Sequence, residues 1–293
     1  SGEMVEDLIL IAMQAFKVTM VALDNSMPRA NFESMKRFCE VHKINVSCNI
    51  YDIQEKYVFT PNYPLIIKKD FLDLHECINI HFALLPKYRG FHPIQCALLN
   101  DDNEVGYTVH KVDPGIDSGP IYFQKKIRVD DLDNIHTLNS RLSSDLKQNF
   151  LSYMIEILKN GKMPELQDEK KAIYAGKRRP EDGLIDWKEN SRYIFNQVRS
   201  VCPPYYPGAY TYMPSGAKVI IESCTPLKLE TPYRHIPGQV VNITEQGEFI
   251  VKTGDGLLAV QKIVCEDKAG TPLDIIGRKI GLRLRNTATK VVT

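Results

Sequence analysis

The sequence predicts an open, twisted α/β sheet flanked by helices and, after it, a small β-barrel. Two observations predict this class. In residues 1 to about 127, short apolar runs alternate with stretches of helical periodicity, and beyond Pro203 and Pro204 only short β-rich runs separated by turns remain. The 293 residues are enough for two domains. We expect a first domain over residues 1–185, a connector helix and loop over 186–205, and a second domain over 206–293.

The first domain starts with a helix, whereas folds of this class usually start with a buried strand. Residues 5–16 have the pattern of the helix that follows such a strand, so we expect the first strand to be missing from the chain. The alternative is that residues 8–13 are themselves that strand. A helix follows over residues 31–42, with Asn31 as its cap. Apolar runs predict strands at residues 17–24, 44–48, 65–67, 78–82, 105–112 and 121–127.

The longest predicted helix covers residues 134–159, and Gly161 follows it as a C-terminal stop. Its larger apolar residues fall close to one face, as in a helix packed on a core. Residues 160–190 are polar and form a connector, and a short helix over 191–201 begins with Ser191 as its cap. The strands of the expected barrel are residues 209–213, 217–224, 239–243, 248–253, 257–264 and 279–284.

The composition is that of an ordinary globular protein. Apolar residues make up 43% of the chain, charged residues 25%, and the formal net charge is +1. These values argue against a disordered chain and against a broad nucleic-acid-binding surface, which needs an excess of Lys and Arg. The longest apolar run, residues 8–13, is far shorter than the roughly 20 residues that span a bilayer. Glu3 and Glu6 stand where a signal peptide has basic residues, so we expect a cytoplasmic protein.

The seven cysteines and seven histidines are scattered along the chain. The sequence contains no Cys-x-x-Cys pair and no His-Glu-x-x-His pattern. We therefore expect reduced thiols and no metal site.

Asn79 and His81 are the first candidates for chemistry. They are two residues apart on a predicted strand, so their side chains project from the same face. The strand runs into a loop rich in Pro and Gly, and ligand sites of α/β sheets lie at the carboxyl ends of strands. An amide beside an imidazole suits acyl transfer, because the imidazole moves a proton and the amide stabilises an oxyanion. The alternative is that both side chains only satisfy nearby backbone groups.

A second segment, residues 112–121, holds two acids in a tight loop with two glycines and two prolines. Either Asp113 or Asp117 could orient His81 and raise its basicity. The alternative is that both acids only make the hydrogen bonds of Asx-turns.

Together these segments resemble the folate-dependent formyltransferase family. The residues that carry the resemblance are, in order, Asn79 and His81, Leu84-Leu85-Pro86, Arg89-Gly90, Gly106, Thr108 and His110, then Asp117, Gly119 and Ile121. Residues 183–187, 198–199 and 203–208 resemble the junction to the C-terminal domain of the longer members. The resemblance implies a Rossmann-like first domain and an OB-like second one. The chain departs from the family at Ala83, where serine is usual.

The resemblance implies transfer of a formyl group from N10-formyltetrahydrofolate, as co-substrate, to an amine. By the match, His81 is the general base or proton shuttle, Asn79 donates to the oxyanion, and Asp117 tunes His81 and helps to move protons. The folate is expected against the segment 65–67 and the loop that holds Asp117. The residues expected there are Leu65, Ile66, Ile67, Asp113, Gly115 and Ile116.

The acceptor is the open part of this interpretation. The neutral charge and the lack of a basic insertion between Asp24 and Asn62 favour a UDP- or dTDP-linked amino deoxysugar of surface-glycan (lipopolysaccharide) biosynthesis over tRNA. Such a substrate needs one or two cations for its diphosphate and an aromatic residue under its base. The candidates are Lys87, Arg89, Gly90, Lys177, Arg178, Arg179, Tyr205, Tyr206 and Tyr210, each with the alternative of being an ordinary surface charge or a packed ring. Methionyl-tRNA formyltransferase is the second hypothesis, and a folate- or nucleotide-binding protein without catalysis is the third. We also expect a homodimer, paired through the edges of the barrel.

Overall fold

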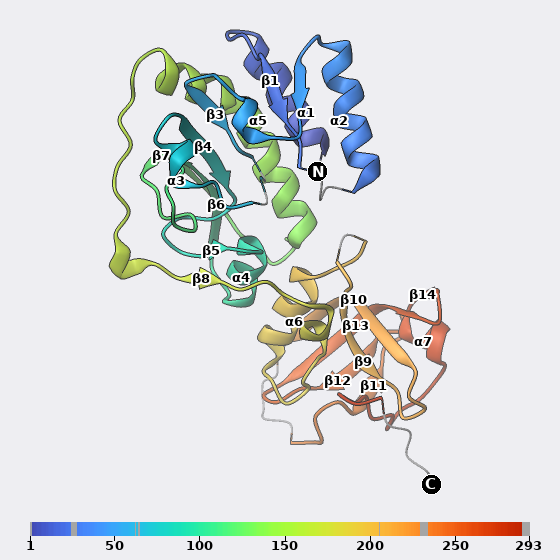
Figure 1. Ribbon diagram of the computed structural model, residues 1–293. Helices are drawn as coiled ribbons and strands as arrows, with labels where there is room; N and C mark the ends of the chain where they lie inside the picture. The colour runs from blue at the N-terminus through green and yellow to red at the C-terminus, as the bar shows by residue number, and fades with distance from the viewer. Residues whose placement is uncertain are drawn as a thin grey trace. The chain divides into compact units, whose positions relative to one another are not determined.

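The computed structural model describes residues 2–24, 28–61, 63, 65–204, 206–228 and 234–288 (Figure 1). The chain divides into two compact units. The first, here called the α/β unit, contains Ser1–Pro93, Glu104–Arg128 and Leu138–Ala175. The second, the β unit, contains Ile94–Asn103, Val129–Thr137 and Gly176–Thr293, so two short segments from the first half of the chain group with it. The boundaries expected near residues 185 and 205 stay predictions.

Four strands form the sheet of the α/β unit, in the order β3-β4-β6-β7. They are β3 (Tyr57–Phe59), β4 (Glu76–His81), β6 (Glu104–Lys111) and β7 (Ile121–Arg128). β3 and β4 are parallel, whereas β4–β6 and β6–β7 are antiparallel. Two further strands, β1 (Met20–Ala22) and β2 (Asn45–Ser47), pair in parallel as a separate sheet. The unit has the mixed α/β character that the sequence predicts.

The helices of this unit confirm two predictions and correct one. α1 (Gly2–Met13) is a helix, so the alternative of a strand over residues 8–13 is wrong. α2 (Arg29–Val41) begins after Pro28, whose side chain makes no cap bond, and the expected cap Asn31 lies inside the helix. Proline suits the start of a helix because its φ is already fixed near the helical value. A short α3 (Lys69–Leu72) follows β3.

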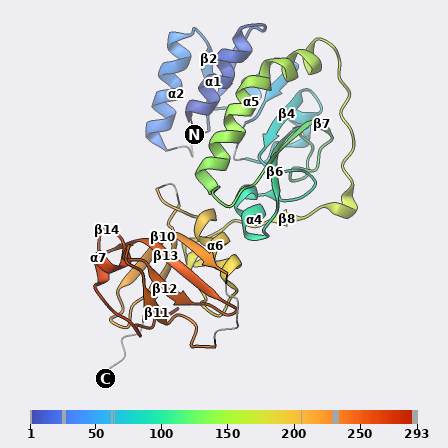
Figure 2. The same ribbon diagram turned by 180° about the vertical axis from the view of Figure 1, so that it is seen from behind.

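α5 (Ile135–Leu158) runs along one face of the four-stranded sheet (Figure 2). Its apolar stripe is buried: Leu138, Leu142 and Leu146 are fully inaccessible. The ring of Phe150 packs edge-on against Phe59 of β3, at 5.9 Å between centroids. The helix therefore anchors the sheet that carries the candidate residues. No helix among the described residues is both long and apolar enough to span a bilayer.

The segment Leu65–Ile67 is not a strand, which corrects the prediction. A strand inside such a sheet buries its side chains, whereas Leu65 is 54% and Ile66 77% exposed. The place beside β4 is taken by β3, where Val58 lies opposite Cys77.

The β unit is built on an antiparallel sheet in the order β11-β12-β13-β10-β9, with β14 paired to β13. Its elements are α4 (Pro93–Leu99), η3 (Pro180–Gly183), α6 (Ser191–Ser200), β9 (Ala209–Tyr212), β10 (Lys218–Leu227), β11 (Val240–Ile243), β12 (Phe249–Lys252), β13 (Leu257–Cys265), β14 (Lys268–Gly270) and α7 (Pro272–Ile276). The cap of α6 is Asn190, one residue before the predicted Ser191, and it accepts a hydrogen bond from the Tyr193 N–H.

The strand pairings of the described residues do not form the closed OB-like barrel that the sequence predicts. The expected strand over residues 279–284 is absent, because Gly281 has a φ of 84°, which breaks an extended run. Residues 283 and 285 instead meet the two sheet edges through isolated bridges, Arg283 with Gln239 and Arg285 with Tyr212. An irregular segment thus covers edges that a continuous strand was expected to close.

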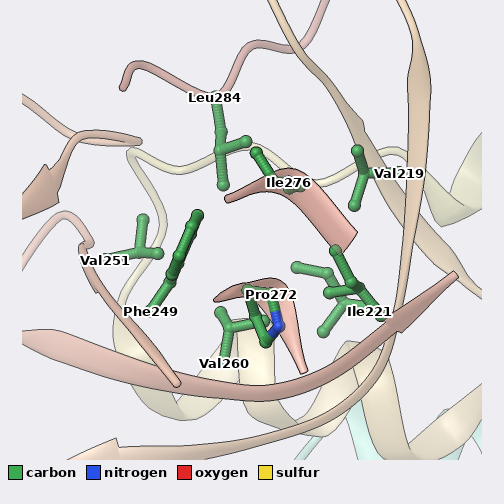
Figure 3. Close-up of a pocket in the computed structure, with 9 residues that line it drawn as sticks. Val219, Ile221, Phe249, Val251, Val260, Pro272, Ile276 and Leu284 are labelled. Atoms are coloured by element: carbon green, nitrogen blue, oxygen red, sulfur yellow. The ribbon is translucent and has the colours of Figure 1, made fainter. Parts of the chain in front are cut away.

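The core of the β unit contains a small apolar pocket (Figure 3). The side chains that line it are Val219, Ile221, Phe249, Val251, Val260, Ile263, Pro272, Ile276 and Leu284. Its free volume is about 10 Å³, and a bound water needs roughly 10–15 Å³ together with polar partners. The pocket is therefore a gap in the packing and offers nothing to a polar ligand.

Candidate active site

Two neighbouring antiparallel strands bring the candidate residues together. Asn79 and His81 lie on β4, and Asn79 is directly opposite His110 of β6. Directly opposite residues of a strand pair project from the same face, so the amide and the imidazole meet. The loop between β6 and β7 then returns Asp117 to this face. We call Asn79, His81, His110 and Asp117 the polar cluster.

The atoms of the polar cluster are close enough to interact. His81 Nδ1 lies 3.5 Å from Asp117 Oδ2, and His110 Nε2 lies 3.6 Å from Asp117 Oδ1. The Asn79 amide nitrogen is 3.3 Å from His110 Nε2 and 3.5 Å from Asp117 Oδ1. The structure thus brings together the three residues that the sequence selected, and it answers which acid faces His81.

The backbone determines which nitrogen of His81 carries the proton. His81 Nε2 lies 2.9 Å from the carbonyl oxygen of Tyr88, and since a carbonyl only accepts, Nε2 carries the hydrogen. The neutral ring therefore has its lone pair on Nδ1, which faces Asp117. Burial lowers the pKa of His81, against the opposing effect of Asp117, so the ring is neutral near pH 7.

Asp117 is held as a carboxylate. Burial alone raises its pKa, but the neighbouring rings of His110 and His81 and the hydrogen bond from the Gly90 N–H together lower it below the usual value. The Gly90 N–H donates to Asp117 Oδ2 at 2.8 Å. Asp117 has a φ of 50°, in the left-handed region that few residues other than glycine adopt.

His110 is the residue of the cluster that sequence reasoning did not select for a role. Its side chain is 2% exposed. Its Nδ1 lies 2.9 Å from the Lys111 carbonyl oxygen and so carries the hydrogen, which leaves Nε2 to accept from the Asn79 amide. His110 belongs to the motif with Gly106 and Thr108 that carries the family resemblance, so the sequence did point to it. Its pairing with Asn79, however, depends on the strand register.

The loop after β4 is tied to β6 through backbone atoms. The Thr108 hydroxyl donates to the Ala83 carbonyl oxygen at 2.6 Å and accepts from the Leu85 N–H at 3.3 Å. Because the bond uses the main chain of residue 83, alanine at this position makes it as well as serine would.

Comparison with known proteins identifies the family. A profile described as formyl transferase matches residues 16–154, and one described as the formyl transferase C-terminal domain matches residues 177–275. The methionyl-tRNA formyltransferase of Thermodesulfovibrio yellowstonii is 33% identical over 258 residues, which are 87% of this chain and 79% of the relative. The chain belongs to the formyl transferase family.

Two solved structures share the fold of this formyltransferase. The N-formyltransferase from Helicobacter canadensis, in complex with folinic acid and dTDP-3-aminofucose, has a TM-score of 0.68 at 20% identity, over 88% of this chain and 95% of that chain. WlaRD, a sugar 3N-formyl transferase in the presence of dTDP and 5-N-formyl-THF, has a TM-score of 0.64 at 21% identity, over 90% of this chain and 94% of that chain. A folate co-substrate is typical of the formyltransferase family.

The residues expected to contact the folate differ in their surroundings. Leu65 and Ile66 are exposed, whereas Ile67 is buried at 7%. Asp113 accepts from the Gly115 N–H at 3.1 Å and from the Ser118 hydroxyl at 2.8 Å, so it forms the turn. Ile116, next to Asp117, is 48% exposed. Asp113 therefore makes the hydrogen bonds of an Asx-turn, which was the alternative interpretation of both acids, whereas Asp117 faces His81.

Arg89 does not fit the predicted role of a phosphate ligand. Its side chain is fully buried, and all five N–H donors are used by Gln167, Glu169 and Tyr174. The Gly90 N–H is likewise taken, by Asp117. A diphosphate would find no free donor on either residue.

The other acceptor candidates are distributed over both units. Lys87 of the α/β unit is exposed. In the β unit, Arg179 is exposed, Tyr206 packs against the apolar core, and Tyr210 is buried under Lys218. Tyr205 lies outside the described residues. Within the part of the chain that the structure describes, no group of three or more His, Cys, Asp or Glu side chains is arranged to hold a metal ion.

Proposed function

We propose that this formyltransferase moves the formyl group of N10-formyltetrahydrofolate to the amine of a nucleotide-linked amino deoxysugar. The observation that carries the proposal is the polar cluster, in which the lone pair of His81 Nδ1 and an amide N–H of Asn79 both lie beside the carboxylate of Asp117. Acyl transfer between two nitrogens needs these three functions: a base, a counter-charge for the protonated base, and an oxyanion donor.

His81 is the proposed base. The attacking amine forms a bond to the formyl carbon and gives a proton to His81 Nδ1, so that an N–H bond breaks and an Nδ1–H bond forms. The imidazolium is stabilised by Asp117, whose Oδ2 lies 3.5 Å away. When the bond from the formyl carbon to N10 breaks, the same proton passes to N10. A neutral His81 is required at the start, which agrees with its lowered pKa. Acid–base groups of this kind contribute on the order of 10²–10⁴ in rate.

Asn79 and His110 complete the proposed machinery. The Asn79 amide donates to the oxygen that gains charge as the amine attacks, an interaction that is worth roughly 3 kcal/mol in comparable sites. His110 orients that amide by accepting from it at 3.3 Å. The folate contacts are proposed at Leu65–Ile67 and at Asp113, Gly115 and Ile116. They are supported by the exposed apolar side chains of Leu65, Ile66 and Ile116.

A nucleotide-linked sugar is the proposed acceptor for two reasons. The formal net charge of +1 does not suit the many phosphate contacts of a bound tRNA. The two solved sugar formyltransferases share the fold over 94% and 95% of their own chains. Lys87, Arg179, Tyr205 and Tyr206 stay the proposed contacts, and the expected homodimer and cytoplasmic location belong to the same proposal.

Methionyl-tRNA is the second candidate acceptor. It is favoured by the 33% identity to the Thermodesulfovibrio yellowstonii enzyme, which extends over 79% of that protein.

The test is an assay of the purified chain with N10-formyltetrahydrofolate and three kinds of acceptor: UDP-linked amino deoxysugars, dTDP-linked amino deoxysugars and methionyl-tRNA. We expect formylation of a nucleotide-linked sugar, detected as a mass increase of one formyl group. Formylation of methionyl-tRNA alone, with binding that weakens steeply as salt rises, would replace the proposed acceptor by the second candidate. Transfer to none of them would contradict the proposal.

A further inference from the structure

Arg89 is buried beside the polar cluster and bound on every side. Its Nη1 and Nη2 donate to the two carboxylate oxygens of Glu169 at 2.9 and 2.6 Å. Nε and Nη2 donate to Gln167 Oε1 at 3.2 and 2.8 Å, and Nη1 also donates to the Tyr174 hydroxyl at 3.2 Å. A fully satisfied guanidinium is a rigid anchor, because its fork fixes the direction of each partner.

Gln167 connects Arg89 to the loop that holds Asp117. Its Oε1 accepts both bonds from Arg89, and its Nε2 donates to the carbonyl oxygens of Asp117 and Gly119 at 2.8 and 2.7 Å. Both amide hydrogens are therefore spent on the turn around residue 117. A side chain that bonds two carbonyls of one turn holds the backbone angles of that turn.

Asp117 is also held from its other end. Its carboxylate accepts from the Gly90 N–H, and Gly90 pairs with Ala175 where β5 (Arg89–Gly90) lies beside β8 (Tyr174–Ala175). A Cβ on Gly90 would lie 2.9 Å from the Ala175 carbonyl oxygen, so the backbones are in close approach there. Residues 89 and 90 thus hold the side chain of Asp117 directly and its main chain through Gln167. This closed ring of bonds maintains a φ of 50° that an aspartate does not adopt by itself without cost.

We propose that Arg89 and Gln167 are positioning residues that set the distance between Asp117 and His81. The pair touches no substrate; it acts by fixing the turn from which the carboxylate projects. The consequence for transfer rests on the proposed role of His81 and Asp117, whereas the consequence for their geometry does not.

The test uses two variants that both preserve the local charge. Gln167→Met keeps the volume but removes both donors, and Arg89→Lys keeps the charge but offers three donors in place of five. In each we expect the turn to relax and Asp117 to move away from His81. The pKa of His81 then falls, because the nearby carboxylate raises it. This pKa is measured by NMR titration of the histidine ring protons, with His81→Ala to assign the signal.

In the transfer assay we expect kcat to fall by about 10²-fold with little change in either KM, as for a misplaced catalytic group. Gln261→Met is the matched control, since Gln261 is a half-buried glutamine of β13 in the other unit, bonded only weakly to Thr225 at 3.4 Å. It should change neither the pKa of His81 nor kcat.

Folded Gln167→Met and Arg89→Lys proteins in which His81 titrates as in the wild type and kcat is unchanged would overturn the inference. A lower melting temperature with an unchanged His81 pKa would also overturn it, because the network would then be structural alone. If instead His81→Ala retains full transfer, the proposed function fails, while the titration still decides whether Arg89 and Gln167 position Asp117.

Discussion

The polar cluster of the α/β unit, whose residues are buried or half-buried, and the apolar pocket of the β unit are built in opposite ways. In the cluster, Asn79, His81, His110 and Asp117 face one another within 3.3–3.6 Å. In the pocket of the β unit, nine apolar side chains face one another and no polar group joins them (Figure 3).

The difference shows what each unit contributes. Burying a polar group costs free energy unless it is paired, so four facing polar side chains are not what stability alone would favour. The free-energy cost of burying them is low because backbone atoms of Tyr88, Gly90 and Lys111 make hydrogen bonds with the side-chain atoms that point away from the centre of the cluster. The β unit shows the arrangement that stability does favour: a continuous apolar core with only a small gap.

The largest effect is expected for His81→Ala. Loss of the base should lower kcat by about 10²–10⁴-fold without unfolding the α/β unit. The measurement is the rate of formyl transfer, with circular dichroism as a check of the fold. His235→Ala, at an exposed position of the β unit, is the control and should retain full activity. Full turnover by His81→Ala would exclude the polar cluster as the catalytic centre and favour another chemistry.

A smaller effect is expected in the pH dependence. Catalysis needs the neutral ring of His81, so kcat/KM falls as the pH drops through the pKa of His81. Burial puts that pKa below its ordinary value of 6.5, and the acidic limb should therefore lie below pH 6.5. Asp117→Asn removes the charge that raises this pKa, and should move the limb to still lower pH while lowering kcat. A limb that stays in place in Asp117→Asn would contradict the coupling of the two residues.

The smallest effect on turnover is expected for the pocket of the β unit. Ile221 is fully buried there, and Ile221→Val should lower the free energy of unfolding by about 0.5–1.5 kcal/mol. The value of kcat per folded molecule should not change. Urea unfolding and the transfer assay measure the two quantities separately. A loss of kcat without a loss of stability would mean that this core takes part in function after all.

Local patterns were enough to predict part of the site. Asn79 and His81 were found from their spacing on one strand, because alternation along a strand depends only on the chain's own geometry. The choice between Asp113 and Asp117 was beyond that logic. Both are acids in one turn, and only the folded loop shows that Asp113 bonds Gly115 while Asp117 faces His81.

The errors have a common cause. Leu65–Ile67 has the composition of a strand, but β3 takes the place beside β4 and leaves Leu65 and Ile66 exposed. Arg89 has the character of a phosphate ligand, but Glu169 and Gln167, which lie about 80 residues further on, use its donors. In both cases the deciding partner is distant in sequence.

The sequence by itself determined the α/β and β composition of the two halves, the family, and the pair Asn79 and His81. Each of these follows from short-range periodicity or from motifs that a chain displays without folding. Only the tertiary structure decided that His110 joins the cluster, that Asp117 is the acid that faces His81, and that the donors of Arg89 are all used inside the protein. Those outcomes depend on the strand register and on the path of the loop between β6 and β7, both of which are stabilised by contacts between residues far apart in the chain.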